Sequence, residues 1–389
     1  MSTSTPSIAE NFSLREARFA TQQYMAPNPA IYWIDFLLTI LVGHICFGVA
    51  RTLTADLYMS AWAPPGGWRS PVAPLLPGSL VLRMWIHAGT SIAACLLFYR
   101  GSMFIHELVH LRRGTFNGFR FAWNALCGIP FLMPSFVYYT HLDHHRREHY
   151  GTQTDGEYLP LSHVRPVMIL LWTLHPFLLP PLTVFRFLIL GPLSWFIPPL
   201  RKLAHERFSS LIIDPTYIRP MPSKARLRTI RLQEFLCLLW CCFLPIFAIR
   251  TFGGLLPFLV QAYFTGVALL FINGLRTLGA HRWLNTGERM TFVEQLLDSV
   301  NYPKHGWITG LWGPVGTRYH ALHHLFPTMP YHNFPAAHRA LMKHLQESSP
   351  YLQTSANSLT GSLISLYRRA AANQRSAVSS RVTQADNAN

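Results

Sequence analysis

The sequence predicts an all-α integral membrane protein with about four transmembrane helices in two hairpins, further interfacial helices and a histidine-rich cytoplasmic cap. Half of its 389 residues are hydrophobic and only 13% are charged, whereas a soluble domain carries about 25% charged residues. Several apolar stretches approach the roughly 20 residues that a helix needs to cross a bilayer. Three clusters of histidines follow long apolar stretches.

Each expected hairpin joins two apolar stretches. The first hairpin combines residues 31–50 and 80–105, and the connecting residues 51–79 are rich in Pro and Gly. The second hairpin combines residues 235–249 and 254–275. Because a hairpin crosses the bilayer twice, the segments before and after it lie on the same side of the membrane. All three histidine clusters are therefore expected on one face.

Two further apolar segments are interrupted by residues that break helices. Residues 121–139 contain Gly128, Pro130 and Pro134, and proline inside a helix removes a backbone hydrogen bond and kinks the chain. We expect this segment to be re-entrant or interfacial. Residues 164–200 are also rich in proline and predict interfacial helices or a short hairpin. Either arrangement keeps the number of membrane crossings even.

The chain is predicted to have three parts. Residues 1–30 are polar and lack the apolar core of a signal peptide, and we expect an interfacial helix near residues 11–20. Residues 31–345 form the membrane domain. Residues 346–389 lack sustained apolar periodicity beyond Leu359–Leu366, which predicts a mobile polar tail. The six cysteines form no Cys-x-x-Cys pattern, so neither a disulfide framework nor a zinc site is expected from them.

The positive charge of the chain gives its orientation. The formal net charge is +16, and a dense group of Lys and Arg falls within residues 201–231, between the apolar segments. Cytoplasmic loops of membrane proteins carry such an excess. We therefore expect a bacterial inner-membrane protein whose histidine clusters face the cytoplasm. The basic residues are explained by the lipid bilayer, and no nucleic-acid partner is predicted.

The histidine clusters have the spacing of ligands on helices. They read His106-Glu-Leu-Val-His110, His141-Leu-Asp-His144-His145 and His320-Ala-Leu-His323-His324. Residues three or four apart share one face of a helix, and neutral imidazole suits iron, copper and zinc. Eight imidazoles exceed the four to six ligands of one ion, and each triplet can serve one metal or divide between two. A two-metal site that activates O2 favours iron.

The histidines are also compatible with two other functions. The first cluster is also His-Glu-x-x-His, the motif of zinc proteases, in which Glu107 would be the general base. An intramembrane zinc protease would leave six cluster histidines without a role. A metal transporter or metal sensor is also less favoured, because transporters place ligands near the bilayer midplane and these clusters lie beyond the ends of the spans.

The three clusters, their order and the hydropathy resemble the bacterial type of the membrane fatty acid desaturase superfamily, which includes hydroxylases. The stretch from His320 to His338 (HALHHLFPTMPYHNFPAAH) and the segment Arg276-Thr-Leu-Gly-Ala-His281-Arg-Trp carry the resemblance. It covers roughly residues 30–345. It implies a desaturase-like domain with two iron ions and O2 as co-substrate. His281 matches an additional ligand that precedes the third cluster in this family.

The resemblance also implies the reaction. We expect oxidation of a fatty acid, an acyl thioester or a lipid, most simply by desaturation. Hydroxylation, or decarboxylation of a free fatty acid to a terminal alkene, needs the same ligands, and a sphingolipid or carotenoid substrate is open. The first cluster is H-x-x-x-H instead of H-x-x-x-x-H, and no His-Pro-Gly-Gly element marks a fused cytochrome b5. Electrons would come from a separate donor, such as a ferredoxin or a cytochrome with its reductase.

Residues within and beside the clusters are candidates for supporting roles. Glu107, Asp143 and Asn333 can accept hydrogen bonds and would orient ligand imidazoles. Arg146 and Arg282 flank the clusters and would bind the head group of the substrate. His149, His332 and His338 lie nearby, and we expect them to be structural instead of ligands.

Overall fold

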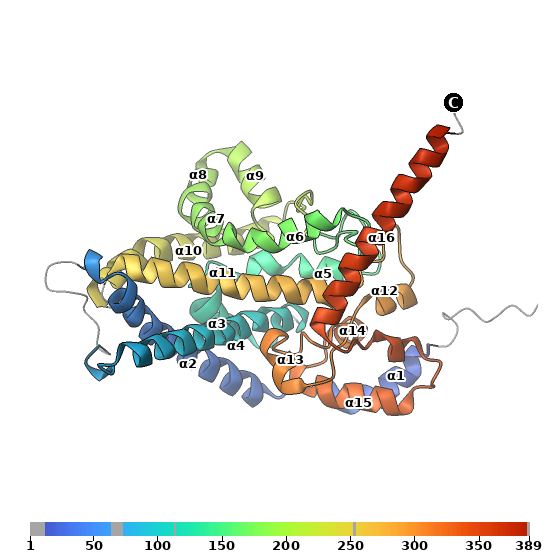
Figure 1. Ribbon diagram of the computed structural model, residues 1–389, viewed down its shortest axis with the longest axis horizontal. Coiled ribbons are helices and arrows are strands. Elements are labelled where there is room, and N and C mark those ends of the chain that lie inside the picture. Colours follow the sequence, from blue (N-terminus) through green and yellow to red (C-terminus); the bar gives the residue numbers. More distant parts are fainter. Residues whose placement is uncertain (1–11, 64–72, 113, 252–253, 387–389) are drawn as a thin grey trace, which may run out of the picture.

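The computed structural model describes residues 12–63, 73–112, 114–251 and 254–386, and the chain is helical throughout (Figure 1). The α-helices are α1 (Leu14–Thr21), α2 (Pro29–Tyr58), α3 (Leu80–His110), α4 (Asn117–Trp123), α5 (His141–His144), α6 (Pro166–Leu174), α7 (Leu179–Phe185), α8 (Gly191–Phe196), α9 (Pro198–Arg207), α10 (Lys224–Thr251), α11 (Leu255–Ala280), α12 (Phe292–Asp298), α13 (Gly306–Trp312), α14 (His320–Leu325), α15 (Phe334–His344) and α16 (Leu359–Asp386). The segments η5 (Asn124–Gly128) and η8 (Arg186–Leu190) are π-helical. Short 3-10 turns are η2 (Gln22–Tyr24), η3 (Ser60–Trp62), η4 (Ala73–Leu75), η6 (Ser135–Tyr138), η7 (His175–Phe177), η9 (Tyr331–Asn333) and η10 (Pro350–Thr354). No strand occurs in these described ranges.

The four predicted spans are confirmed as long apolar helices in two hairpins. They are α2, α3, α10 and α11, and α3 packs against both α2 and α11. Asn28 caps α2 by accepting a hydrogen bond from the backbone N–H of Ala30, and Pro29 occupies its first turn, where a missing N–H costs nothing. In Figure 1 the four long helices run side by side, α7, α8 and α9 lie above them, and α5, α12 and α14 gather toward the right-hand end.

The first span is longer than the sequence predicted. Helix α2 continues to Tyr58, so Arg51 lies inside the helix instead of the loop, and its side chain is buried. The Arg51 guanidinium donates hydrogen bonds to the carbonyl oxygens of Ala248 (3.1 Å) and Gly254 (2.7 Å) at the turn between α10 and α11. An arginine predicted in a solvated loop therefore joins the two hairpins. Residues 64–72 of that loop lie outside the described residues.

A fifth helix has the length and composition of a span. Residues Leu179–Phe196 run through α7, η8 and α8, and they follow a shorter apolar helix at Pro166–Phe177. A single crossing here would put His145 and the start of α10 on opposite sides of the membrane. His281 at the end of α11 lies close to His144, and α10 and α11 form a hairpin, so the start of α10 is on the side of His145 and the number of crossings between them is even. The interfacial helices or short hairpin expected for residues 164–200 stay a prediction.

The segment with broken helical character is also interrupted in the structure. Helix α4 passes into η5, a turn follows at residues 129–132, and η6 ends shortly before the second histidine cluster. Asn124 stabilises the bend, because its Oδ1 accepts the backbone N–H of Ser135 at 3.0 Å. No helix of this segment is among the candidate spans found in the described residues.

The C-terminal segment differs from the predicted mobile tail. Helix α16 runs from Leu359 to Asp386 and packs against α6 and α11. Leu363, Leu366 and Ala370 lie in a cluster with buried aromatic residues that contact His281, and spacings of three and four residues place them on one helix face. An apolar stripe only two turns long was too short to recognise in a polar sequence. The end of α16 projects from the body (Figure 1).

Candidate metal centre

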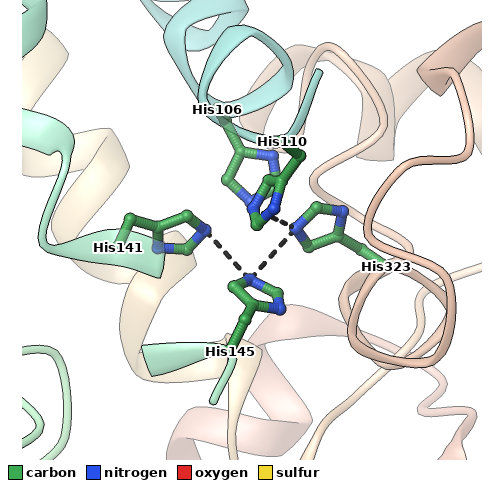
Figure 2. Close-up of side chains that lie close together, drawn as sticks. All are labelled: His106, His110, His141, His145 and His323. Atoms are coloured by element: carbon green, nitrogen blue, oxygen red, sulfur yellow. Dashed lines mark hydrogen bonds between the residues drawn. The ribbon is translucent and has the colours of Figure 1, made fainter. Parts of the chain in front are cut away.

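The structure brings the nine predicted histidines together in two groups. The five-histidine group contains His106, His110, His141, His145 and His323 (Figure 2). The four-histidine group contains His144, His281, His320 and His324. In each group, one ring nitrogen per residue lies within 4.8 Å of every other. These residues come from α3, α5, α14 and the residues that directly follow α5 and α11.

Two short helices each serve both groups. His141 on α5 and His145 directly after it are four residues apart and face the five-histidine group, while His144 faces the other. On α14 the division is reversed, because His320 and His324 share a face and His323 points away from it. Successive residues of a helix are about 100° apart. The x-x-His-His spacing therefore points the two adjacent imidazoles toward different histidine groups.

His281 is placed by backbone pairing at the end of α11. Its backbone pairs with Ser299 in an isolated antiparallel bridge, and Asn301 pairs with Tyr319 and Ser355 in two further bridges. The Asn301 Oδ1 accepts the backbone N–H of Leu322 at 3.1 Å. The segment around Asn301 thus connects the histidine after α11 to the helix that carries the third cluster.

The ring nitrogens within each group are in direct contact. In the five-histidine group, the Nε2 atom of His145 lies 3.0 Å from that of His141 and 3.2 Å from that of His323. Figure 2 shows these rings converging on one point. In the four-histidine group, the Nε2 atom of His320 lies 2.9 Å from that of His281 and 3.1 Å from that of His324.

Acidic groups, directly or through a tyrosine, bind the outer nitrogens of three of these rings. The Nδ1 of His141 bonds the Glu157 carboxylate at 2.9 Å, and the Nδ1 of His144 bonds Asp155 at 2.8 Å. The Nδ1 of His281 lies 2.8 Å from the Tyr150 hydroxyl, which donates to Asp298 at 2.8 Å. A carboxylate at Nδ1 keeps the proton there and leaves the Nε2 lone pair directed into the group.

The electrostatic environment favours neutral imidazoles in most positions. Burial lowers the pKa of His141, His145, His320, His323 and His324 well below the usual range. Neutral imidazole is the form that binds a metal.

The pair of His144 and Asp155 behaves differently from the other rings. Burial opposes charge on both groups, but their mutual attraction outweighs it, so the pKa of His144 is raised and that of Asp155 is lowered.

The arrangement fits two metal cations. Several Nε2 atoms face one another with their lone pairs, an arrangement that is repulsive unless a cation lies between them. Both ring nitrogens of His106, and the Nδ1 atoms of His145, His320 and His323, are buried without a hydrogen-bond partner. Buried polar atoms without partners are uncommon in folded proteins. The two groups together offer nine nitrogens, enough for two ions that each keep open positions.

Comparison with known proteins identifies the family. The profile of the fatty acid desaturase family matches residues 83–356, which include all nine histidines. The chain belongs to the fatty acid desaturase family. A ceramide hydroxylase of Caulobacter vibrioides (strain NA1000 / CB15N) is 37% identical over 367 residues, which cover 93% of this chain and 95% of that protein. No solved structure matches the chain. The resemblance inferred from the histidine clusters is thereby confirmed.

Membership of the fatty acid desaturase family makes the chain a membrane-bound oxidoreductase of lipid metabolism.

The interpretation as a zinc protease is not supported by the geometry of Glu107. Its Oε2 accepts hydrogen bonds from the Tyr32 hydroxyl (2.7 Å) and the Tyr331 backbone N–H (3.0 Å). The carboxylate is buried in this contact and joins α2 and η9 to α3, so it is not available as a general base.

Three residues predicted to orient the family's histidine ligands have other partners. Besides Glu107, these are Asp143, which forms an ion pair with Arg146 at 2.9 Å, and Asn333, which donates to the Tyr24 carbonyl at 2.9 Å. Within the described residues, none of the three bonds a ring of the two groups. This corrects the prediction, which followed proximity in sequence. Glu107 and Asp143 are adjacent to ligand candidates in the chain, but they leave their helices in other directions.

The residues that do contact the rings were not predicted. Tyr150, Asp155 and Glu157 lie in turns after the second cluster, and Asp298 ends α12. One signal was present: the chain holds only 17 acidic residues, so each buried acid in a membrane protein is a candidate for a functional role. Asp155 and Asp298 are fully buried.

The two arginines proposed for the head group lie at the periphery. The side chain of Arg146 is 59% exposed, and that of Arg282 donates to the carbonyl oxygen of Gln353. A role in head-group binding stays a prediction for both. Of the nearby histidines, His338 bonds the Tyr351 hydroxyl at 2.8 Å, His332 bonds Asn333, and His149 bonds Thr154. All three lie outside the two groups.

Proposed function

We propose that this protein hydroxylates a ceramide-type lipid with O2 at a site of two iron ions. The observation that supports the substrate and the reaction is its 37% identity, over 93% of the chain, to a ceramide hydroxylase. The two histidine groups support the two-metal site. Desaturation, which the sequence alone favoured, uses the same ligands and is the second candidate, supported by the family match.

In this proposal the nine histidines of the two groups are the iron ligands. Iron would supply the activation of O2 that removal of hydrogen from an unactivated C–H bond requires. Hydroxylation inserts one oxygen atom of O2 into the C–H bond, and two electrons and two protons convert the other atom to water. A separate donor, such as a ferredoxin or a cytochrome with its reductase, would deliver the electrons.

The contribution of the protein is to hold the ligands and exclude water. Glu157, Asp155 and the Tyr150–Asp298 pair retain the Nδ1 protons of three rings, so that Nε2 of each ring is free to bind. Such outer contacts fix the tautomer and the ring orientation. Six of the nine histidines are buried, which protects reactive species from water.

The proposed location is the bacterial inner membrane with both groups on the cytoplasmic side. The start of α10 and the end of α11 lie on the side of the histidines, and the basic residues 201–231 precede or enter α10 on that side. This supports the assignment because positive charge accumulates in cytoplasmic loops.

The test is lipid analysis of cells that contain ceramide and express the wild type or His323→Ala. We expect a ceramide with one added oxygen atom in the wild type only, with both proteins present in the membrane fraction. A ceramide product that has lost two hydrogen atoms would show that the reaction is desaturation instead of hydroxylation. Full activity of His323→Ala, or a purified wild type without iron, would contradict the two-iron site.

A further inference from the structure

A large cavity lies on the far side of α3 from the histidines. Its volume is about 860 Å³, within the range of small-molecule sites. Helices α3 and α10 and the α4–η6 segment form its walls. The lining residues include Ile105 and Leu108 of α3, Leu236 and Trp240 of α10, and the polar Ser135 and Gln233. None of the nine histidines of the two groups is among them.

Helix α3 separates the cavity from the five-histidine group. Ile105 and Leu108 face the cavity, whereas His106 and His110 face the other histidines. At about 100° per residue, the first pair points roughly 150° away from the second. The cavity is thus about one helix diameter from the proposed irons and does not hold the carbon that reacts.

The polar residues of the cavity gather toward one end. The Gln233 amide donates to the Ser135 hydroxyl at 3.1 Å, and that hydroxyl lies 3.3 Å from the hydroxyl of Tyr139. Gln233 is near the start of α10, whereas Leu239 and Phe243 lie two to three turns further along the helix. A lipid in the leaflet on the histidine side has the same order, with its polar group at the surface and its chain directed inward.

The apolar part opens to the bilayer. Leu232 is 58% exposed, Leu239 47% and Phe243 51% on the surface of a membrane-spanning helix, while Ile105 and Leu108 are buried behind them. Exposed side chains on a span contact lipid tails, so a chain can enter sideways from the membrane. A water-soluble ligand would have no such route.

The polar groups suit an uncharged head group. Ser135, Tyr139, Gln233 and Asn124 are neutral, and they offer both donors and acceptors. Arg120 is the only cation among the lining residues, and its guanidinium already donates to the backbone carbonyls of Leu111 (2.9 Å) and Thr115 (3.2 Å). Four neutral polar side chains and one cation line the cavity, so the amide and hydroxyl groups of an uncharged head group match the lining better than a phosphate or a carboxylate does.

We propose that this cavity binds the chain of a two-chain lipid that is not oxidised, with the amide and hydroxyl groups of the lipid near Ser135 and Gln233. The inference rests on the proposed function, because one chain must reach the histidines while the other lies across α3. A single-chain fatty acid cannot occupy both places. The cavity therefore selects ceramides over free fatty acids.

The experiment uses purified full-length protein and two ceramide probes, each with a photoreactive diazirine on one of the two chains. After illumination, labelled peptides are identified by mass spectrometry. We expect one probe to label the segment 232–243. The variant Leu236→Trp, which fills the cavity, should reduce that labelling about tenfold, the effect of displacing roughly two methylene groups from an apolar site. Ile246→Trp is the control, because Ile246 is 61% exposed on α10 and does not line the cavity.

Labelling that Leu236→Trp leaves unchanged, or that Ile246→Trp reduces equally, would overturn the inference. Equal labelling by a free fatty acid probe would also overturn it, because the cavity would then not distinguish two chains from one. Ceramide oxidation is measured separately by lipid analysis. Cavity labelling without oxidation would support the inference and contradict the proposed function, so the two can fail independently.

Discussion

Replacement of Asp155 by Asn tests whether the buried acids control the metal groups. The Asp155 side chain is 0% exposed. Its Oδ2 accepts from the Nδ1 of His144 (2.8 Å) and the N–H of Gly151 (2.9 Å), and its Oδ1 accepts from the N–H of Glu157 (2.9 Å). An amide of the same shape turns one of these acceptors into a donor, so at least one buried N–H loses its partner.

The size of the effect follows from two independent magnitudes. A buried polar group without a partner costs about 1–3 kcal/mol. Loss of an outer contact to a ligand imidazole lowers metal affinity roughly 10–100-fold, which corresponds to about 1.4–2.7 kcal/mol. We therefore expect the four-histidine group, which contains His144, to lose its iron first. The five-histidine group should lose iron at a higher concentration of competing chelator.

The assay is the iron content of purified protein across a series of chelator concentrations. Asp143→Asn is the matched control, since Asp143 lies beside His144 in sequence but its carboxylate bonds only Arg146 among the described residues. We expect Asp155→Asn to release about one of two irons at roughly tenfold less chelator than the wild type, and Asp143→Asn to match the wild type. Coincident curves for Asp155→Asn and the wild type would refute the role of the buried acid.

Three further predictions follow from other contacts. His281→Ala should lose activity and iron from the four-histidine group while the protein stays in the membrane; wild-type iron content would contradict its assignment as a ligand. Burial lowers the pKa of His338 to about 4, below the roughly 6.5 of an unfolded chain, so the stability that neutral His338 contributes is complete above pH 6.5 and is lost as the pH falls toward 4. Between neutral pH and pH 5, the free energy of unfolding of His338→Asn should therefore fall by about 2 kcal/mol less than that of the wild type. Parallel curves of stability against pH, from thermal unfolding, would contradict this. The Leu366 side chain in α16 is 1% exposed, and Leu366→Ala should lower the free energy of unfolding by about 2–5 kcal/mol. The Ile364 side chain is 47% exposed, and Ile364→Ala should have little effect. Equal losses of stability in the two variants would show that α16 does not pack as described.

The sequence predicted the elements whose signal is local. Long apolar runs identified the four spans, and helical spacing identified the histidines that α5 and α14 present. His281 was found only through resemblance, because a single histidine beside an arginine has no periodic signal. Its place depends on pairing with Ser299, a contact between residues that no local pattern connects.

The outer contacts could not be predicted because they depend on how distant turns fold back. Asp155 and Asp298 are far apart in the chain, yet both reach rings of the four-histidine group. Glu107 was expected to assist its neighbours but turns toward Tyr32, since adjacent residues of a helix point about 100° apart. The end of α2 was missed for a different reason. In the sequence, Arg51 is a charged residue after an apolar run, which predicts a loop. Its burial depends on hydrogen bonds to distant carbonyl groups, which the sequence does not show.

The shared use of α5 and α14 has a consequence for the spacing of the two metals. Each helix contributes to both groups, so the backbone between neighbouring histidines would fix how far apart two bound ions lie. A shift of either helix would move ligands of both groups together. The separation of the ions would then be set when the protein folds, before either ion binds. Occupancy of one group should consequently hold the ligands of the other in position.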